Sequence, residues 1–94
     1  MSTTTGTSSG TGVRVEVRYF AGAAAAAGTG AEHLELPVGS AVGDVLAALA
    51  ATHPALRPVL EVASVLLGEV VVRDRSTPVP DGAQLDVLPP FAGG

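Results

Sequence analysis

The chain has 94 residues and a mass of 9.2 kDa, which is the size of one small domain. Its five basic residues are all arginine, and its nine acidic residues bring the formal net charge to −4, so it lacks the cationic surface that binds nucleic acid. Because it contains neither lysine nor cysteine, it has no phosphate-loop lysine, Schiff-base lysine, thiolate nucleophile or zinc–thiolate site.

The chain begins with MSTTTGTSSGTG, a tract of Ser, Thr and Gly that predicts a disordered tail over residues 1–12. A secretory signal needs a positively charged start and an apolar stretch, and this tract has neither. No apolar run approaches the roughly 18 to 20 residues that cross a bilayer. We therefore expect a cytoplasmic protein without a membrane segment, whose folded domain spans residues 13–94.

Two strands separated by a short helix are expected first. Residues 13–20, VRVEVRYF, alternate strictly and predict a half-buried strand. One face carries Val13, Val15, Val17 and Tyr19, and the other carries Arg14, Glu16, Arg18 and Phe20. Five alanines between Gly22 and Gly28 predict a short helix closed by glycine. Residues 32–37, EHLELP, predict a second strand paired with the first, with Leu34 and Leu36 inward and His33 and Glu35 outward.

An amphipathic helix is predicted over residues 41–52 from the helical spacing of Val42, Val45, Leu46 and Leu49. Ser40 is expected to cap its first turn, and Asp44 lies where a carboxylate favours the positive end of the helix dipole. His53, which precedes Pro54, marks the end of this helix.

A Pro-marked connector separates this helix from the last strands. SVLLGEVVV predicts a hairpin bent at Gly68, and residues 77–82, TPVPDG, predict a turn-rich loop. QLDVL predicts a final strand with Leu85 and Val87 inward and Asp86 and Leu88 outward. This order of elements indicates an α+β fold, in which a mixed sheet has one face covered by the main helix. Parallel pairing of the first and last strands would need a right-handed crossover through that helix.

The uncovered face of this sheet is expected to carry an apolar spot. Phe20 and Leu88 would lie at the same end of neighbouring strands, among charged side chains. Two large apolar groups placed together in this way favour a surface for a protein partner.

The chain resembles a known family over residues 13–94. The segments SAVGDVLAALAATHPAL, VLLGEVVV and TPVPDG and the ending LPPFAGG are similar to those of the MoaD/ThiS group of ubiquitin-like β-grasp sulfur carriers. Within this group, Leu88-Pro89-Pro90 ahead of Ala92-Gly93-Gly94 is most similar to the small subunit of molybdopterin synthase. The carriers of the thiamin pathway usually lack the double proline.

This resemblance implies a carrier whose reactive group is the carboxylate of Gly94. An E1-like adenylyltransferase partner would use ATP to convert that carboxylate to an acyl adenylate, and a sulfur donor would then displace AMP and leave a thiocarboxylate. The sulfur would pass to a pterin precursor in the large subunit of the synthase during molybdenum cofactor biosynthesis. The chain itself would bind no cofactor or metal and would have no catalytic centre.

The flexible tail over residues 89–94 is the part that would enter the partners. The prolines would set its exit direction, and glycines without Cβ atoms can thread a narrow channel. The residues expected to contact the partners are Phe20, Leu88, Pro89, Pro90, Phe91, Ala92 and Gly93.

Two differences from the family pattern leave alternatives open. Leu67 stands where relatives often have Asn before the hairpin glycine, so the turn type is expected to differ. Phe91 is bulkier than the usual small aliphatic residue, which suggests a wider channel or another acceptor. A carrier for thiamin, cysteine or secondary-metabolite biosynthesis is the first alternative. A ubiquitin-like interaction module that carries no sulfur is the second.

The other polar residues are expected to be structural. We assign no function to His33, and we read His53 and Asp44 as helix-end residues. Arg73, Asp74 and Arg75 are expected in a solvated loop.

Overall fold

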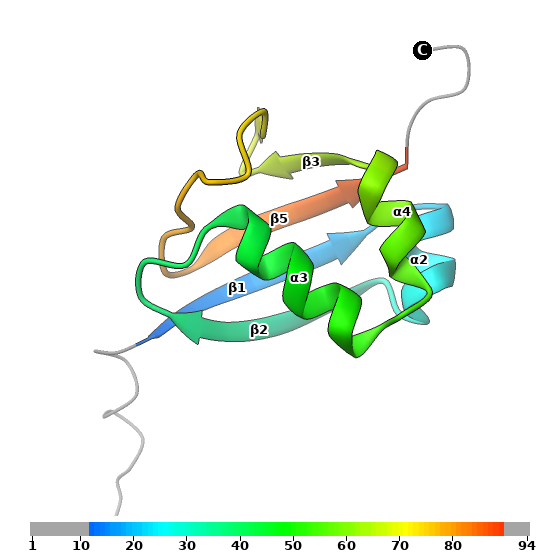
Figure 1. The fold of residues 1–94 in the computed structure, drawn as a ribbon, viewed down its shortest axis with the longest axis horizontal. Coiled ribbons are helices and arrows are strands. Elements are labelled where there is room, and N and C mark those ends of the chain that lie inside the picture. Colours follow the sequence, from blue (N-terminus) through cyan, green and yellow to red (C-terminus); the bar gives the residue numbers. More distant parts are fainter. Residues whose placement is uncertain (1–11, 90–94) are drawn as a thin grey trace, which may run out of the picture.

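The computed structural model describes residues 12–89 (Figure 1). Five strands form one mixed sheet in the order β2-β1-β5-β3-β4. Along the chain the elements are β1 (Gly12–Tyr19), α2 (Gly22–Ala27), β2 (Ala31–Pro37), α3 (Val42–Thr52), α4 (Leu56–Val62), β3 (Ser64–Leu67), β4 (Val70–Val71) and β5 (Ala83–Leu88).

The pairing of the strands confirms the predicted topology. β1 is antiparallel to β2, with Val15 opposite Leu34, and parallel to β5, with Val17 opposite Leu85. β3 is antiparallel to both β5 and β4. The fold is therefore the expected α+β β-grasp arrangement, in which the first and last strands lie side by side at the centre of the sheet.

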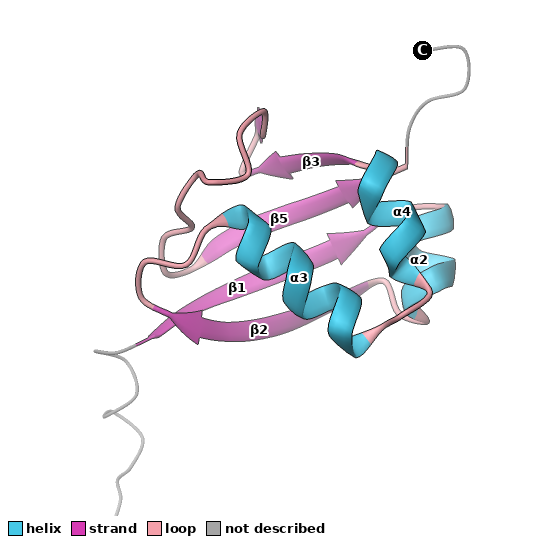
Figure 2. Cartoon of the chain, viewed as in Figure 1, coloured by secondary structure: helices cyan, strands magenta, loops and turns pink. Residues whose placement is uncertain are grey.

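The core lies between the sheet and the helices. Figure 2 shows α3 crossing one face of the sheet, while α2 and α4 lie together at the end toward which β1 and β5 point. Every inward residue predicted for β1 is buried, as are the four predicted apolar positions of α3. The fully buried larger side chains are Val15, Val17, Val42, Val45, Leu49, Leu56, Leu85 and Val87.

The start of α3 differs from the prediction in its cap. Ser40 does not cap the helix, because its Oγ donates to the carbonyl of Pro37 at 2.8 Å and Ala41 takes the capping position. The Oδ2 of Asp44 accepts from the backbone N–H of Ala41 at 2.8 Å. This contact is the carboxylate half of a capping box. The prediction that Asp44 stabilises the first turn is therefore confirmed, and the prediction for Ser40 is wrong.

The segment interpreted as a Pro-marked connector contains a helix, α4. Pro58 lies in its first turn, where a backbone N–H has no acceptor within the helix, so the proline is tolerated there. Leu56 and Leu60, four residues apart, are buried and attach α4 to the core. Packing of these two leucines against the core thus stabilises a helix that Pro54 and Pro58 made difficult to predict from the sequence.

The predicted hairpin is present, and its turn comprises Gly68 and Glu69. Leu67 stays in the strand opposite Val70, and Gly68 is the first turn residue, with φ of +64°. Glu69 has no positive φ. A glycine with positive φ followed by a residue with negative φ is typical of a type II′ turn, which needs no special residue at position 67.

No helix in the described part of the chain is long and apolar enough to cross a membrane. The longest, α3, has 11 residues.

Candidate functional site

The expected site begins where β5 ends. Val87 near the end of β5 pairs with Tyr19 of β1 on one side and Val65 of β3 on the other, so the chain leaves from the middle of the sheet (Figure 1). Leu88 and Pro89, where β5 ends, are half-buried. The other predicted tail residues lie outside the described residues: Pro90, Phe91, Ala92, Gly93 and Gly94.

An apolar patch lies beside this exit, on the sheet face opposite α3. The backbone N–H of Phe20 donates to the carbonyl of Val87 at 3.1 Å, which places Phe20 next to Leu88 as expected. Phe20 is 39% exposed. The register also brings Leu66 and Val71 to this face, since Leu66 pairs with both Asp86 and Val71. We call Phe20, Leu66, Val71 and Leu88 the outer apolar patch.

Leu66 and Val71 were predicted as hairpin residues and not as part of the patch. Alternation within VLLGEVVV contains the signal, because the buried Val65 assigns its neighbour Leu66 to the outer face. The patch is therefore larger than predicted and extends from the end of β1 across β5, β3 and β4.

A charged pair lies next to the patch and holds β1 against β5. Arg18 donates from Nε to Oδ1 of Asp86 at 3.0 Å and from a terminal nitrogen to Oδ2 at 3.2 Å. This contact raises the pKa of Arg18, first through the hydrogen bond to Asp86 and then through its charge. The guanidinium carbon also lies 5.6 Å from the ring centroid of Phe20, within the range of a cation–π contact.

Asp86 corrects one expectation. It points to the outer face as predicted, yet it is only 6% exposed, because Arg18 covers it. The alternation identified its face, but it could not reveal that a neighbouring strand supplies a cover. The Arg18–Asp86 pair therefore borders the patch on the side where Phe20 lies.

A second polar cluster was not predicted from the sequence. On the inner face, Oε2 of Glu32 accepts from the hydroxyl of Tyr19 at 2.5 Å and lies 2.7 Å from Nε2 of His53. Burial, followed by the hydrogen bond to Glu32, raises the pKa of Tyr19. The cluster joins the ends of β1 and α3 to the start of β2. The cluster lies at the end of the sheet where β5 ends, and its Tyr19 directly precedes Phe20 in the chain. His53 is confirmed as a helix-end residue, and it also contacts Glu32.

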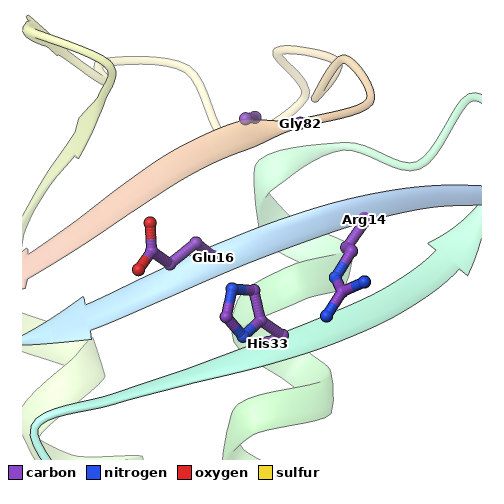
Figure 3. Close-up of a pocket in the computed structure, with 5 residues that line it drawn as sticks. Arg14, Glu16, His33 and Gly82 are labelled. Carbon is purple, nitrogen blue, oxygen red and sulfur yellow. The ribbon is translucent and has the colours of Figure 1, made fainter.

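A shallow pocket of about 180 Å³ lies on the same outer face but at the start of β5. Figure 3 shows the ring of His33 between the side chains of Arg14 and Glu16. His33 is exposed, as predicted. Residues 12–89 contain no group of three His, Cys, Asp or Glu that could hold a metal ion. The pocket has neither a nucleophile paired with a base nor a donor set for a cofactor.

The loop at residues 73–75 has structural contacts. A terminal nitrogen of Arg75 donates to the carbonyl of Leu60 at 3.1 Å, and the carbonyl of Arg75 accepts from the N–H of Gly43 at 2.8 Å. Asp74 accepts from the N–H and hydroxyl of Ser76, which lowers its pKa. This loop therefore ties the start of α3 to the end of α4.

Comparison with known proteins gives a relative of the expected kind. The chain is 32% identical over 83 residues to a protein of Chlamydomonas reinhardtii described as a molybdopterin synthase sulfur carrier subunit, covering 87% of this chain and all of that one. It also resembles the crystal structure of small archaeal modifier protein 1 from Haloferax volcanii, with a TM-score of 0.77 and 26% identity. That match covers 85% of this chain and all of the archaeal one.

A third similar structure is a protein–protein complex. One chain of the complex of subunits 1 and 2 of molybdopterin-converting factor from Helicobacter pylori matches with a TM-score of 0.66 and 24% identity. The match covers 87% of this chain and all of that one, and at this identity it supports the fold alone.

The family model of the ThiS family matches residues 17–94, which include the last three residues of β1, all later elements and the glycine pair. With this match and the β-grasp topology, the chain belongs to the ThiS family.

Proposed function

We propose that this chain is a sulfur carrier and serves as the small subunit of a molybdopterin synthase. The observation that carries the proposal is the position of the glycine pair. Gly93 and Gly94 fall within the family match and follow a central strand whose exit is bordered by the outer apolar patch. The curated relative with the sulfur-carrier description supports the same activity.

The proposed chemistry takes place at the backbone carboxylate of Gly94. A carboxylate is a poor electrophile, so an E1-like partner first transfers AMP from ATP to it and releases pyrophosphate. Hydrosulfide or an equivalent donor then attacks the acyl carbon, AMP leaves, and a thiocarboxylate remains. Its sulfur attacks a carbon of the pterin precursor and displaces an oxygen leaving group. Water then cleaves the acyl–sulfur bond, so the sulfur stays on the pterin and the carboxylate of Gly94 is regenerated. Because these steps consume ATP, we place the reaction in the cytoplasm.

The folded domain contributes recognition and delivery in this scheme. The outer apolar patch docks on the large subunit, because it lies beside the point where β5 ends. Pro89 and Pro90 direct the tail toward the partner, and Phe91, Ala92 and Gly93 occupy the entrance of the partner's channel. The partners supply the acid, base and phosphate-binding groups.

Intact-mass measurement tests the carrier function. The full chain is incubated with its E1-like activating enzyme, ATP and sulfide, and a variant lacking Gly94 is treated in parallel. The full chain should gain the mass of one oxygen-to-sulfur exchange at Gly94, and the truncated variant should not. Val38→Asp is the matched control, since Val38 is an exposed apolar residue outside the patch and the tail.

The acceptor pathway is tested separately. The sulfurated chain should convert the pterin precursor in the presence of the large subunit, and the full chain should restore molybdenum-enzyme activity in a strain that lacks its own carrier. An unchanged mass in every reaction contradicts the carrier function. A mass exchange without pterin sulfuration would instead support a carrier for thiamin, cysteine or another sulfur compound.

A protein modifier is the second candidate, because several similar structures are named small archaeal modifier proteins. The same activated Gly94 would then form an amide with an amine on another protein. Adducts of this chain on other proteins, found by peptide mass spectrometry after the same activation, would support this candidate.

A further inference from the structure

The outer edge of β2 carries backbone groups that pair with no other strand of the described chain. β2 is at the edge of the sheet and antiparallel to β1. The N–H of Tyr19 donates to the carbonyl of Gly30 at 2.9 Å, which sets the alternation of the ladder. Even-numbered residues of β2 therefore direct their N–H and C=O groups toward β1, and odd-numbered residues direct theirs outward.

The two ends of this outward row are already satisfied by the chain itself. The hydroxyl of Thr29 donates to the carbonyl of Ala31 at 3.0 Å and lies 3.4 Å from its N–H. The carbonyl of Pro37 accepts from the N–H and hydroxyl of Ser40, and proline has no N–H. His33 and Glu35 remain, with two donors and two acceptors that no residue in 12–89 satisfies.

We infer that a second copy of this chain pairs antiparallel with this edge about a two-fold axis at Leu34. In this register His33 lies opposite Glu35 of the second copy, and each residue uses its outward N–H and C=O groups. The two symmetric pairs form four hydrogen bonds, which satisfy the four groups left on each edge. The sheets of the two copies then join into one.

The side chains favour this register over its neighbours. His33 and Glu35 are both exposed on the outer face, so each imidazole would face a carboxylate across the axis. A register shifted to place His33 on the axis would oppose two imidazoles, and one with Glu35 on the axis would oppose two carboxylates. Two carboxylates placed directly opposite each other repel, and two opposed imidazoles leave out the imidazole–carboxylate contact. Only the axis at Leu34 gives two unlike pairs, and it brings the half-buried Leu34 side chains together on the inner face.

Exposed strand edges normally carry charges that repel another strand. Here the imidazole of each copy lies opposite a carboxylate of the other, so the two edges complement each other. The edge of β2 also lies on the opposite side of β1 from β5, β3 and β4, which carry the exit and most of the outer apolar patch. The dimer would leave both tails accessible, and the inference does not depend on the proposed function.

Sedimentation equilibrium of the full chain from roughly 20 µM to 1 mM tests the dimer, since such a small interface should be weak. A monomer–dimer equilibrium is expected. His33→Glu or Glu35→His alone should weaken association roughly tenfold, because each creates two like pairs. The double swap His33→Glu/Glu35→His restores both unlike pairs and should recover the wild-type association.

Glu35→Pro supplies a test of the backbone contacts. It removes an outward N–H without disturbing the hydrogen bonds to β1, a position where an edge strand tolerates proline, and it should abolish association. Circular dichroism checks that each variant is folded. A chain that remains monomeric at 1 mM overturns the inference. A double-swap variant that associates as weakly as the single variants also overturns the inference. Variants that all associate like the wild type overturn it as well, because they show that the copies associate through another surface.

Discussion

Arg18 covers the carboxylate of Asp86 with two hydrogen bonds across the parallel pair of β1 and β5. Asp86 is buried, whereas the side chain of Arg18 is 43% exposed. The two partners therefore depend on each other unequally. Asp86 loses its only charged partner in the described chain if Arg18 is removed, but Arg18 keeps access to water if Asp86 is removed.

This inequality predicts different costs for the two single substitutions. Arg18→Met should lower the free energy of unfolding more than Asp86→Asn does, because the buried carboxylate of Asp86 is left without its charged partner. Asp86→Asn should cost about 1 kcal/mol. The double variant Arg18→Met/Asp86→Leu should be more stable than Arg18→Met. Urea unfolding measures all three, and equal losses for the two single variants would contradict the argument.

Phe20→Asp should weaken binding to the large synthase subunit by roughly tenfold or more, since it places a charge in the middle of an apolar contact. Val38→Asp is the control because Val38 is 63% exposed, more than Phe20, and lies outside the patch. Titration calorimetry with the large subunit measures both affinities. Equal affinities for the two variants would exclude Phe20 from the docking surface.

Tyr19 should titrate above its usual range. Burial and the contact with Glu32 raise its pKa, so the folded state holds the phenol proton more tightly than the unfolded state. This contribution to stability is fully present below about pH 10, the ordinary tyrosine value, and is lost as the pH rises toward the folded-state pKa.

Tyr19 is the single tyrosine in the chain, so the ultraviolet absorbance of phenolate reports this residue alone. Its midpoint in the folded protein should lie above that of the urea-unfolded chain. Tyr19→Phe should lose about 1 kcal/mol at neutral pH and should lose less additional stability above pH 10 than the wild type. A folded midpoint equal to the unfolded one would contradict the burial argument.

Gly68→Val should lower the free energy of unfolding by about 1 to 2 kcal/mol, because a β-branched residue is strained at a φ of +64°. A Cβ atom at this position meets nothing within 4 Å, so the cost is purely conformational. Gly68→Asn, which tolerates positive φ better, should cost less. Thermal unfolding of the two variants distinguishes them, and equal melting temperatures would contradict the assigned turn.

The elements predicted most accurately are those with a strict pattern. The alternation in β1 and the helical spacing in α3 require only that one side be apolar, so the buried residues in both follow directly from the sequence. α4 was missed because its signal is short and contains Pro58, whose effect depends on its position within the helix.

The candidate site could be predicted only in part for a similar reason. Phe20 and Leu88 follow from alternation and from the parallel pairing of their strands. The cover that Arg18 provides for Asp86, and the contacts of Glu32 with Tyr19 and His53, join residues 13 to 68 positions apart. Such contacts depend on how the elements pack, which a local pattern does not contain.

The central position of β5 also has a mechanical consequence. A partner that draws the tail into a channel while holding the domain pulls along β5, which is bonded on one side to β1 and on the other to β3. The load is then shared by both ladders in shear and does not peel an edge strand away one bond at a time. The domain can therefore bear tension on its tail without unravelling.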